Sequence, residues 1–290
     1  MARRAARLPE NVPGPFFVDD TCIDCAVCRH LEPAVFGRSP RELSFVARQP
    51  DSEEERRRSL MALVACPTSS IGTEPKIDAT PGVDAFPDPI ADGVFSCGFT
   101  AESSFGAWSY LVTRSSGNVL VDSPRAAEPL LKRLGDLGGV RYMFLSHRDD
   151  VADHAAFERR FGCQRILHER DVTAGTRGVE RKIAGQDPVP LGPDLLAIPV
   201  PGHTPGSAVL LYRETFLFTG DHLMGSEDEC GLYASRGVCW YSWPEQVRSM
   251  ERLLDFRFEW VLPGHGGRYR AASAAAMRKE LERVVTEMKA

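Results

Sequence analysis

The segment Leu145–His154, LSHRDDVADH, holds two histidines and three aspartates within ten residues. Imidazole nitrogens and carboxylate oxygens are common protein ligands of divalent cations. The segment continues the apolar run VRYMFL, which is typical of a buried strand, so the polar residues come at that strand's carboxyl end. This density of ligands predicts a metal-binding loop, although the spacing fits no simple metal motif.

A second group of ligand-type residues lies near the N-terminus. Cys22, Cys25 and Cys28 are each separated by two residues, and Cys66 is followed by a proline. This spacing lets one loop place three thiolates around a cubane iron–sulfur cluster, and the distant Cys-Pro supplies the fourth. Zinc also takes four thiolates, but its sites are typically built from two Cys-x2-Cys pairs. The other four cysteines show no pattern: Cys97, Cys163, Cys230 and Cys239.

The cysteine-containing segment resembles the single-cluster bacterial ferredoxins over about residues 15–75. The likeness rests on FVDD, the three spaced cysteines, EPAVF and CPTSSI, with a helix over SEEERRRSLMALVA that returns the chain to the cluster. It implies one [4Fe-4S] cluster with these ligands: Cys22, Cys25, Cys28 and Cys66. Clusters of this kind pass single electrons, and some are purely structural.

Composition limits the class of protein and its partners. The chain has 290 residues, of which 43% are hydrophobic, so it can bury a full core, and its formal net charge is −5. This charge gives no general attraction to nucleic acid or to an anionic membrane. The basic start MARRAAR is not followed by an apolar segment, and no apolar run approaches the roughly 18 residues of a membrane span. We therefore expect a cytoplasmic protein in a reducing compartment.

The pattern of elements predicts two domains. Residues 1–74 form the short cysteine-containing domain, and the proline-rich residues 75–92 read as a linker or surface strap. Residues 93–290 alternate strand-like and helix-like segments and end in an amphipathic helix over ASAAAMRKELERVVTEMK. Several of the predicted strands end in a turn that contains histidine or aspartate.

Four such loops occur in order: SHRDDVADH, PGHTPGS, TGDHL and PGHGG. Together they resemble the metal motifs of the metallo-β-lactamase superfamily, over about residues 93–290. The resemblance implies an αββα sandwich with metals held at the sheet edges by loops. The predicted fold class is therefore α+β, with a ferredoxin-like domain followed by this sandwich.

The same resemblance implies a ligand set. Asp221 matches the carboxylate that bridges two metals, and the pair Asp153 and His154 matches the Asp-His that closes the first motif and binds the second metal. The catalytic carboxylates are then Asp153 and Asp221. The full set of expected metal ligands is His147, Asp149, Asp153, His154, His203, Asp221 and His265.

The first motif departs from the family pattern His-x-His-x-Asp-His. His147 and His154 are seven positions apart, two more than in that pattern, and no histidine lies between them. Asp149 or Asp150 must then serve as the middle ligand, and Asp149 is favoured because it keeps the His-x-ligand step. Alternatively, the two extra residues abolish one metal site and leave a mononuclear centre.

A carboxylate in place of this imidazole changes the metal preference. It adds a negative charge and a harder ligand, which favours iron over zinc. The flavodiiron proteins of the same superfamily hold two irons with Glu at this position and receive electrons from a flavin domain. In this chain a ferredoxin-like domain occupies a comparable place in the sequence.

Three functions follow from these features. The first is an oxidoreductase in which the [4Fe-4S] cluster passes electrons to a non-haem metal site that acts on a small molecule, with a redox partner protein as donor. The second is a zinc hydrolase of esters or thioesters with a structural or sensing cluster. The third is a non-catalytic iron–sulfur sensor or electron carrier.

The aromatic segment CGLYASRGVCWYSW, residues 230–243, lies between the third and fourth metal loops. It reads either as a strap packed on the core or as a wall of the substrate pocket, with these apolar contacts: Tyr233, Trp240, Tyr241 and Trp243. His222 follows Asp221 directly, and Arg268 follows PGHGG, so each is a secondary candidate for a site residue.

Overall fold

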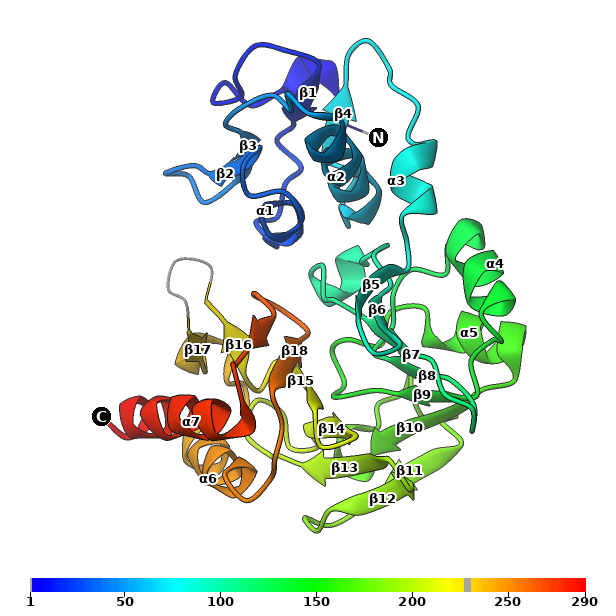
Figure 1. The fold of residues 1–290 in the computed structure, drawn as a ribbon, viewed down its shortest axis with the longest axis vertical. Coiled ribbons are helices and arrows are strands. Elements are labelled where there is room, and N and C mark those ends of the chain that lie inside the picture. The colour runs from blue at the N-terminus through cyan, green and yellow to red at the C-terminus, as the bar shows by residue number, and fades with distance from the viewer. Residues whose placement is uncertain (1, 227–230) are drawn as a thin grey trace. The chain divides into compact units, whose positions relative to one another are not determined.

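The computed structural model describes residues 2–226 and 231–290 (Figure 1). The chain forms two compact units. The first contains Met1–Asn118 with Pro124–Gly139, and the second contains Val119–Ser123 with Val140–Ala290. The segment after residue 93 contributes to both units. Within the described residues, no helix is long and apolar enough to cross a membrane.

The first half of unit 1 consists of short strands and helices around the four spaced cysteines. Strand β1 pairs antiparallel with β4, and β2 pairs antiparallel with β3. Helix α2 is capped by Ser52, whose hydroxyl accepts a hydrogen bond from the Glu55 backbone N–H. Its first turn contains three glutamates, whose negative charges interact favourably with the positive end of the helix dipole. The elements are η1 Arg4–Ala6, β1 Phe16–Val18, α1 Val27–Leu31, β2 Phe36–Arg38, β3 Ser44–Val46, α2 Glu53–Ala65 and β4 Ile71–Thr73.

The rest of unit 1 contains the stretch predicted as a linker. Residues 75–92 hold two short elements, and β5 pairs antiparallel with β6, which pairs antiparallel with β7. Helix α3 lies so close to α2 that a Cβ on Gly82 would come within 2.5 Å of the Leu60 backbone. The elements are α3 Thr80–Asp84, β5 Asp88–Ala91, β6 Val94–Ser96, η2 Glu102–Ser104, β7 Tyr110–Val112 and α4 Glu128–Asp136.

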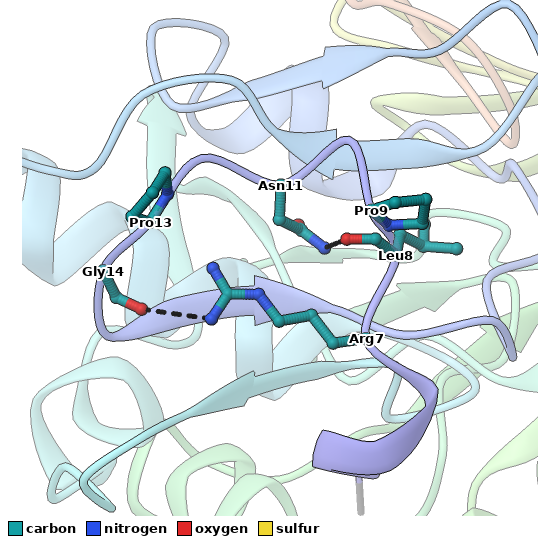
Figure 2. A pocket seen from close by; sticks show the side chains of 6 residues that line it. All are labelled: Arg7, Leu8, Pro9, Asn11, Pro13 and Gly14. Atoms are coloured by element: carbon teal, nitrogen blue, oxygen red, sulfur yellow. Dashed lines mark hydrogen bonds between the residues drawn. The ribbon is translucent and has the colours of Figure 1, made fainter.

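The N-terminal segment of unit 1 encloses an open depression, shown in Figure 2. Its lining residues are Arg7, Leu8, Pro9, Asn11, Pro13 and Gly14. The Arg7 guanidinium donates to the carbonyl oxygens of Val12, at 2.7 Å, and Gly14, at 3.5 Å. This arginine therefore holds the backbone of the segment in place.

Unit 2 begins with four parallel strands in the order β11-β10-β9-β8. Because the strands are parallel, the loops that follow β9 and β10 leave the sheet at the same edge. The strand predicted over VRYMFL is confirmed as β9, and α5 and β10 follow it in the chain. The elements are β8 Val119–Val121, β9 Tyr142–Phe144, α5 His154–Phe161, β10 Gln164–His168, η3 Glu169–Asp171 and β11 Arg181–Ile183.

A six-stranded sheet follows, in the order β12-β13-β14-β15-β18-β19. Its pairings are antiparallel except for β15 with β18, which run parallel. The carboxyl ends of β15 and β18 therefore lie side by side, and the loops TGDHL and PGHGG start there. The strands are β12 Val189–Gly192, β13 Leu195–Pro199, β14 Ala208–Tyr212, β15 Phe216–Gly220, β18 Trp260–Pro263 and β19 Tyr269–Arg270.

Two helices pack on this sheet and form the main core of unit 2. Apolar side chains of α6 and α7, such as Met250 and Leu281, join Val209, Leu217 and Val261 of the strands in one buried cluster. The predicted C-terminal amphipathic helix is confirmed as α7 Ala274–Lys289. The other elements are β16 Met224–Gly225, β17 Leu232–Tyr233, η4 Arg236–Val238 and α6 Trp243–Leu253.

Candidate metal centres

The four patterned cysteines line one cavity in unit 1. Cys22 and Cys25 lie in the loop that enters α1, Cys28 lies in α1 itself, and Cys66 caps the end of α2. Asp24 and Ala26, between these cysteines, have left-handed backbone conformations with φ of 58° and 65°, so the chain turns sharply between successive thiols. The remaining walls are mostly apolar: Val18, Ile23, Val27 and Ile71, with the hydroxyls of Ser44, Thr68 and Ser70.

The chemistry of this cavity fits an iron–sulfur cluster. Burial, reinforced by the neighbouring thiols, raises the pKa of Cys28 to about 12 and that of Cys25 well above its ordinary value. Without a cation these thiols stay protonated at neutral pH, so cluster binding would release their protons. The Ser70 backbone N–H donates to Cys66 Sγ at 3.3 Å, a type of contact that tunes the potential of a bound cluster.

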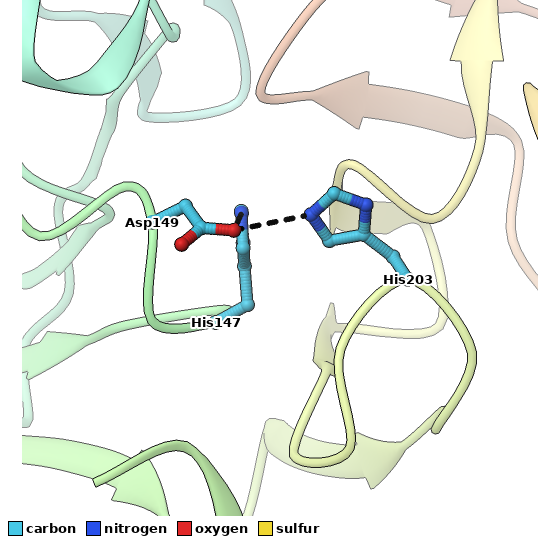
Figure 3. A group of neighbouring side chains, drawn as sticks. All are labelled: His147, Asp149 and His203. Atoms are coloured by element: carbon cyan, nitrogen blue, oxygen red, sulfur yellow. Dashed lines mark ion pairs between the residues drawn. The ribbon is translucent and has the colours of Figure 1, made fainter. Parts of the chain in front are cut away.

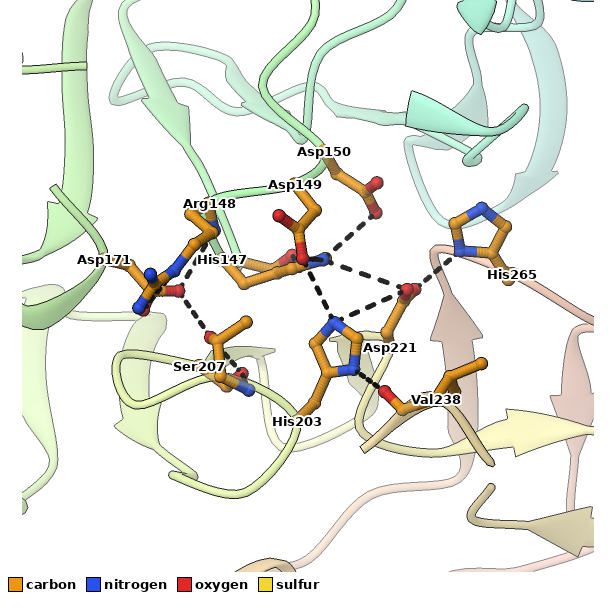
Figure 4. Close-up of polar contacts among 12 residues, drawn as sticks. His147, Arg148, Asp149, Asp150, Asp171, His203, Ser207, Asp221, Val238 and His265 are labelled. Atoms are coloured by element: carbon orange, nitrogen blue, oxygen red, sulfur yellow. Dashed lines mark hydrogen bonds and ion pairs between the residues drawn. The ribbon is translucent and has the colours of Figure 1, made fainter. Parts of the chain in front are cut away.

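The second centre lies in unit 2, where four loops bring histidines and aspartates together (Figure 4). The loop after β9 supplies His147, Asp149 and Asp150, and the turn between β13 and β14 supplies His203. Asp221 follows β15 and His265 follows β18. His265 Nδ1 is 2.8 Å from Asp221 Oδ1, which joins the two loops that start at the parallel strand ends.

Two groups within this cluster have the geometry to hold a metal ion. The first contains His147, Asp149 and His203, and the second contains His147, Asp150 and Asp221. Figure 3 shows the first, with His203 Nε2 3.6 Å and His147 Nε2 3.9 Å from Asp149 Oδ2. In the second group, His147 Nε2 lies 3.9 Å from Asp150 Oδ2 and 3.8 Å from Asp221 Oδ2. These separations suit ligands that surround an ion and are too long for direct hydrogen bonds.

Unsatisfied buried atoms support the assignment of these groups as metal sites. His147 Nε2, His203 Nε2 and Asp150 Oδ2 are buried and have no hydrogen-bond partner among the described residues. Such atoms are rare in folded proteins and call for an explanation. On the other side of its ring, His203 Nδ1 donates to the Val238 carbonyl at 2.6 Å, which leaves the Nε2 lone pair facing the cluster. Cations held by the two groups would give these three atoms partners.

The electrostatics of the site are set by burial and by the mixture of carboxylates and imidazoles. Burial lowers the pKa of His147 to about 4, so its ring is neutral at neutral pH. Burial and the Asp221 carboxylate raise the pKa of Asp150 well above its ordinary value. Burial alone would raise the pKa of Asp221, but His265 and the other imidazoles outweigh it and hold that pKa well below its usual range. Likewise Asp149 and Asp221 overcome burial to raise the pKa of His203.

The structure does not bring Asp153 and His154 into either group. His154 is the first residue of α5, and its Nδ1 lies 3.0 Å from Arg165 Nη1. Arg165 in turn pairs with Glu180 at 2.6 Å. Asp153 is the residue that precedes α5, and Asp150, not Asp153, stands in a group with Asp221. The assignment of Asp153 as a catalytic residue gains no support from this position.

Two buried aspartates that the sequence did not single out hold the loops in place. Asp171 accepts from the Arg148 backbone N–H at 3.0 Å, the Thr204 hydroxyl at 2.5 Å and the Gly206 backbone N–H at 2.8 Å. It therefore ties the loop of His147 to the loop of His203. A Cβ on Gly206 would lie 2.7 Å from Asp171, so this turn requires glycine.

Asp122 is the second of these aspartates. It directly follows β8, and its Oδ1 accepts from the Ser146 backbone N–H at 2.7 Å. Burial raises its pKa to about 7. The sequence signal for Asp122 is its position directly after a buried strand. The carboxyl ends of parallel strands meet at one edge of the sheet, so a residue there lies near the loop that follows β9.

The secondary candidates occupy varied positions. His222 is buried with neither ring nitrogen hydrogen-bonded, and it belongs to neither group. Trp240 is 68% exposed and its ring centroid is 6.4 Å from that of His203, so it lies at the rim of the site. Tyr233 and Tyr241 are also exposed, whereas Trp243 packs against the core. Cys230 lies outside the described residues.

Comparisons with known proteins identify the cysteine-containing segment and the fold of the rest of the chain. Residues 18–73 match the family described as the 4Fe-4S single cluster domain of ferredoxin I. The structure is similar to VMB-1, with a TM-score of 0.52 and 14% identity over 70% of this chain and 97% of that one. It is also similar to a metallo-β-lactamase from Pontibacter korlensis, with a TM-score of 0.50 and 17% identity over 67% of this chain and 97% of that one.

The chain joins a ferredoxin-like [4Fe-4S] domain to a metallo-β-lactamase fold. Both resemblances and the predicted fold class are thereby confirmed. A hydroxyacylglutathione hydrolase of Anaeromyxobacter dehalogenans (strain 2CP-C) is 39% identical over 184 residues, which are 60% of this chain. The match spans 66% of that relative's length.

Proposed function

We propose that the protein is a metal-dependent oxidoreductase in which the cluster domain supplies electrons to a centre in the metallo-β-lactamase fold. The observation that supports this most directly is the group formed by His147, Asp149 and His203. A carboxylate here makes the ligand set harder than an all-histidine site, which suits iron. In the same chain, four cysteines line a cavity suited to a carrier of single electrons.

The residues of the second centre would bind two ions. His147 belongs to both groups, and Asp221 has one oxygen near His147 and the other near His265. We propose Asp221 as the bridging carboxylate, with Asp150 and His265 completing the second ion's ligands. Asp171 and Asp122 would fix the loops, so that the ligands keep their geometry when an ion binds or leaves.

Metal analysis after anaerobic purification tests this function. A cluster with a di-iron site requires about six iron atoms per chain, whereas the cluster alone requires about four. Reduction of the second centre by electrons that enter at the cluster, followed by spectroscopy, should accompany the six-iron composition. A protein with about four irons and one or two zincs would contradict the oxidoreductase.

The hydrolase relative favours a second candidate, a zinc-dependent hydrolase of thioesters or esters. That relative is 39% identical over its matched part. Zinc lowers the pKa of its bound water and so supplies a hydroxide nucleophile near neutral pH. Thioester hydrolysis by the zinc-loaded protein, with the same rate after the cluster is removed, would favour this candidate over the first.

A further inference from the structure

The last turn of α2, which leads to Cys66, is held by residues from outside the ferredoxin-like segment. The Val64 carbonyl accepts a hydrogen bond from Arg125 Nη2 at 2.9 Å. The Ala65 carbonyl accepts one from the Thr100 hydroxyl at 2.7 Å. Carbonyls at the end of a helix have no partner within the helix, so these two bonds fix the peptide groups directly before Cys66. The family match ends at residue 73, and all of these residues belong to unit 1.

The loop of residues 99–106, which contains Thr100, is itself bonded to Arg125. Arg125 donates from Nε to the Thr100 carbonyl and from its backbone N–H to the Phe99 carbonyl, both at 2.8 Å. The Phe99 ring packs edge-on against Phe86, with the ring centroids 5.8 Å apart, and so holds the start of the loop. A single guanidinium therefore bonds both to this loop and to the end of α2.

The far end of the same loop lies against a second cysteine of the cavity. Gly106 has φ of 83°, and a Cβ there would lie 2.7 Å from Cys25 Cβ and 3.0 Å from its Sγ. It would also lie 3.3 Å from Pro67 Cγ, and Pro67 directly follows Cys66. A glycine, which has no Cβ, lets the backbone approach this closely. The loop of residues 99–106 therefore supports the cavity both beside Cys25 and at the end of α2.

We propose that Arg125 is a positioning residue of the cluster site, and that residues 99–106 complete this site outside the ferredoxin-like segment. Arg125 holds the peptide groups before Cys66 and fixes the loop that backs Cys25. Reduction adds a negative charge to the cluster, and a guanidinium bonded two residues before Cys66 favours that charge. The inference rests on the cluster of the proposed function, and it depends neither on the second centre nor on the reaction.

The midpoint potential of the cluster in the full chain tests the role of the charge. In Arg125→Gln the reduced cluster should become about tenfold less favoured, which is a fall of about 59 mV for a one-electron couple. Arg125→Lys keeps the charge and should restore most of the wild-type potential. Arg133→Gln is the matched control, because it removes an arginine of unit 1 that pairs with the exposed Asp84 and should leave the potential unchanged.

The rate at which an iron chelator removes the cluster, measured without oxygen, tests the positioning. Thr100→Val removes the hydroxyl donor to Ala65 without a change of charge. It should speed cluster loss by about tenfold, at the lower end of what loss of an outer partner costs in metal affinity. Thr113→Val is the matched control, because the Thr113 hydroxyl also donates to a backbone carbonyl, that of Gly93 at 3.0 Å, and does not bond to α2.

Gly106→Ala tests the contact at Cys25 by the same measurement. The added methyl group must displace the loop or the cysteine, so the cluster should be lost faster than in the wild type. Gly138→Ala is the matched control, since Gly138 also has a positive φ, 100°, but a Cβ there would make only an ordinary contact, at 3.5 Å from Asn118 Nδ2. This control should lose its cluster at the wild-type rate.

The outcomes separate failure of this inference from failure of the proposed function. A wild-type potential in Arg125→Gln, with wild-type rates of cluster loss in Thr100→Val and Gly106→Ala, would overturn the inference and leave the cluster in place. If Arg125→Gln holds no cluster, Thr100→Val decides, and a wild-type rate there overturns the inference. A wild-type protein without iron and sulfide would overturn both proposals, whereas failure to reduce the second centre would overturn the proposed function alone.

Discussion

The two metal centres are built in opposite ways. Three of the proposed cluster ligands come from seven consecutive residues, and the fourth ends a single helix in the same unit. The proposed ligands of the second centre come from four loops spread over more than a hundred residues, from His147 to His265. A local motif fixes the first set by the geometry of one loop, whereas the second set depends on parallel strands and on the buried Asp171 and Asp122.

The largest effect should come from Cys66→Ser, which breaks the local set. The variant should lose the cluster and its broad visible absorbance, because a neutral hydroxyl is a poor substitute for a thiolate. Unit 1 should also lose much of its stability, since cluster binding contributes directly to folding. Iron analysis and thermal unfolding measure this, and zinc binding at the second centre provides the control. Retention of about four irons per chain would contradict the ligand assignment.

Asp221→Ala should remove the ions of the second centre and leave the cluster in place. Its two oxygens face His147 and His265, so the substitution removes both contacts at once. Because outer partners alone contribute about 10- to 100-fold to affinity, loss of this ligand should weaken zinc binding by more than about 100-fold. Competition with a chelator measures the constant, and unchanged affinity would refute the proposed bridge.

A smaller effect should distinguish the two candidate carboxylates of the first motif. Asp150→Asn should weaken binding of the second ion by about 10- to 100-fold, whereas Asp153→Asn should leave affinity within about twofold. The two substitutions are chemically identical, so Asp153 is the matched control. Isothermal titration of metal-free protein with Zn²⁺ gives both values, and the reverse order would restore the pairing predicted from the family pattern.

The smallest effect should be a pH dependence of affinity at the second centre. Because the pKa of His203 is raised, a proton competes with the metal for its Nε2 up to a higher pH than on an ordinary imidazole. Affinity should therefore rise with pH, by up to about tenfold per pH unit, and level off above that pKa. Chelator competition between about pH 5.5 and 8.5 tests this slope. A profile without slope would show that His203 binds no proton that the metal displaces.

The contrast between the two centres also explains what the sequence could predict. The spacing of Cys22, Cys25 and Cys28 is enough to place three thiols around one cavity, because the loop is short and local. For the second centre, the histidines and Asp221 follow from motifs at strand ends. Asp149 was favoured on its spacing from His147, and it stands with His147 and His203.

The positions of Asp153 and His154 depend on where a helix begins, which the sequence pattern does not show. Asp153 and His154 match the family pattern by type, but α5 begins at His154 and directs that side chain to Arg165. The loop is two residues longer than the family pattern, and which of its aspartates faces the other ligands depends on where the helix begins. Asp171 was missed because its partners lie in loops 23 and 35 positions away, contacts that only the folded chain creates.

The Asp171 junction has a consequence for recognition. Arg148 lies between ligands His147 and Asp149, where a guanidinium would serve as a natural anchor for an anionic substrate. Instead its Nε and Nη2 donate to Asp171, and Nη2 also reaches the Arg170 carbonyl. The positive charge of Arg148 is thus neutralised by the buried carboxylate of Asp171. A carboxylate or phosphate arriving at the centre would find its counter-charge in the bound metal ions rather than in Arg148.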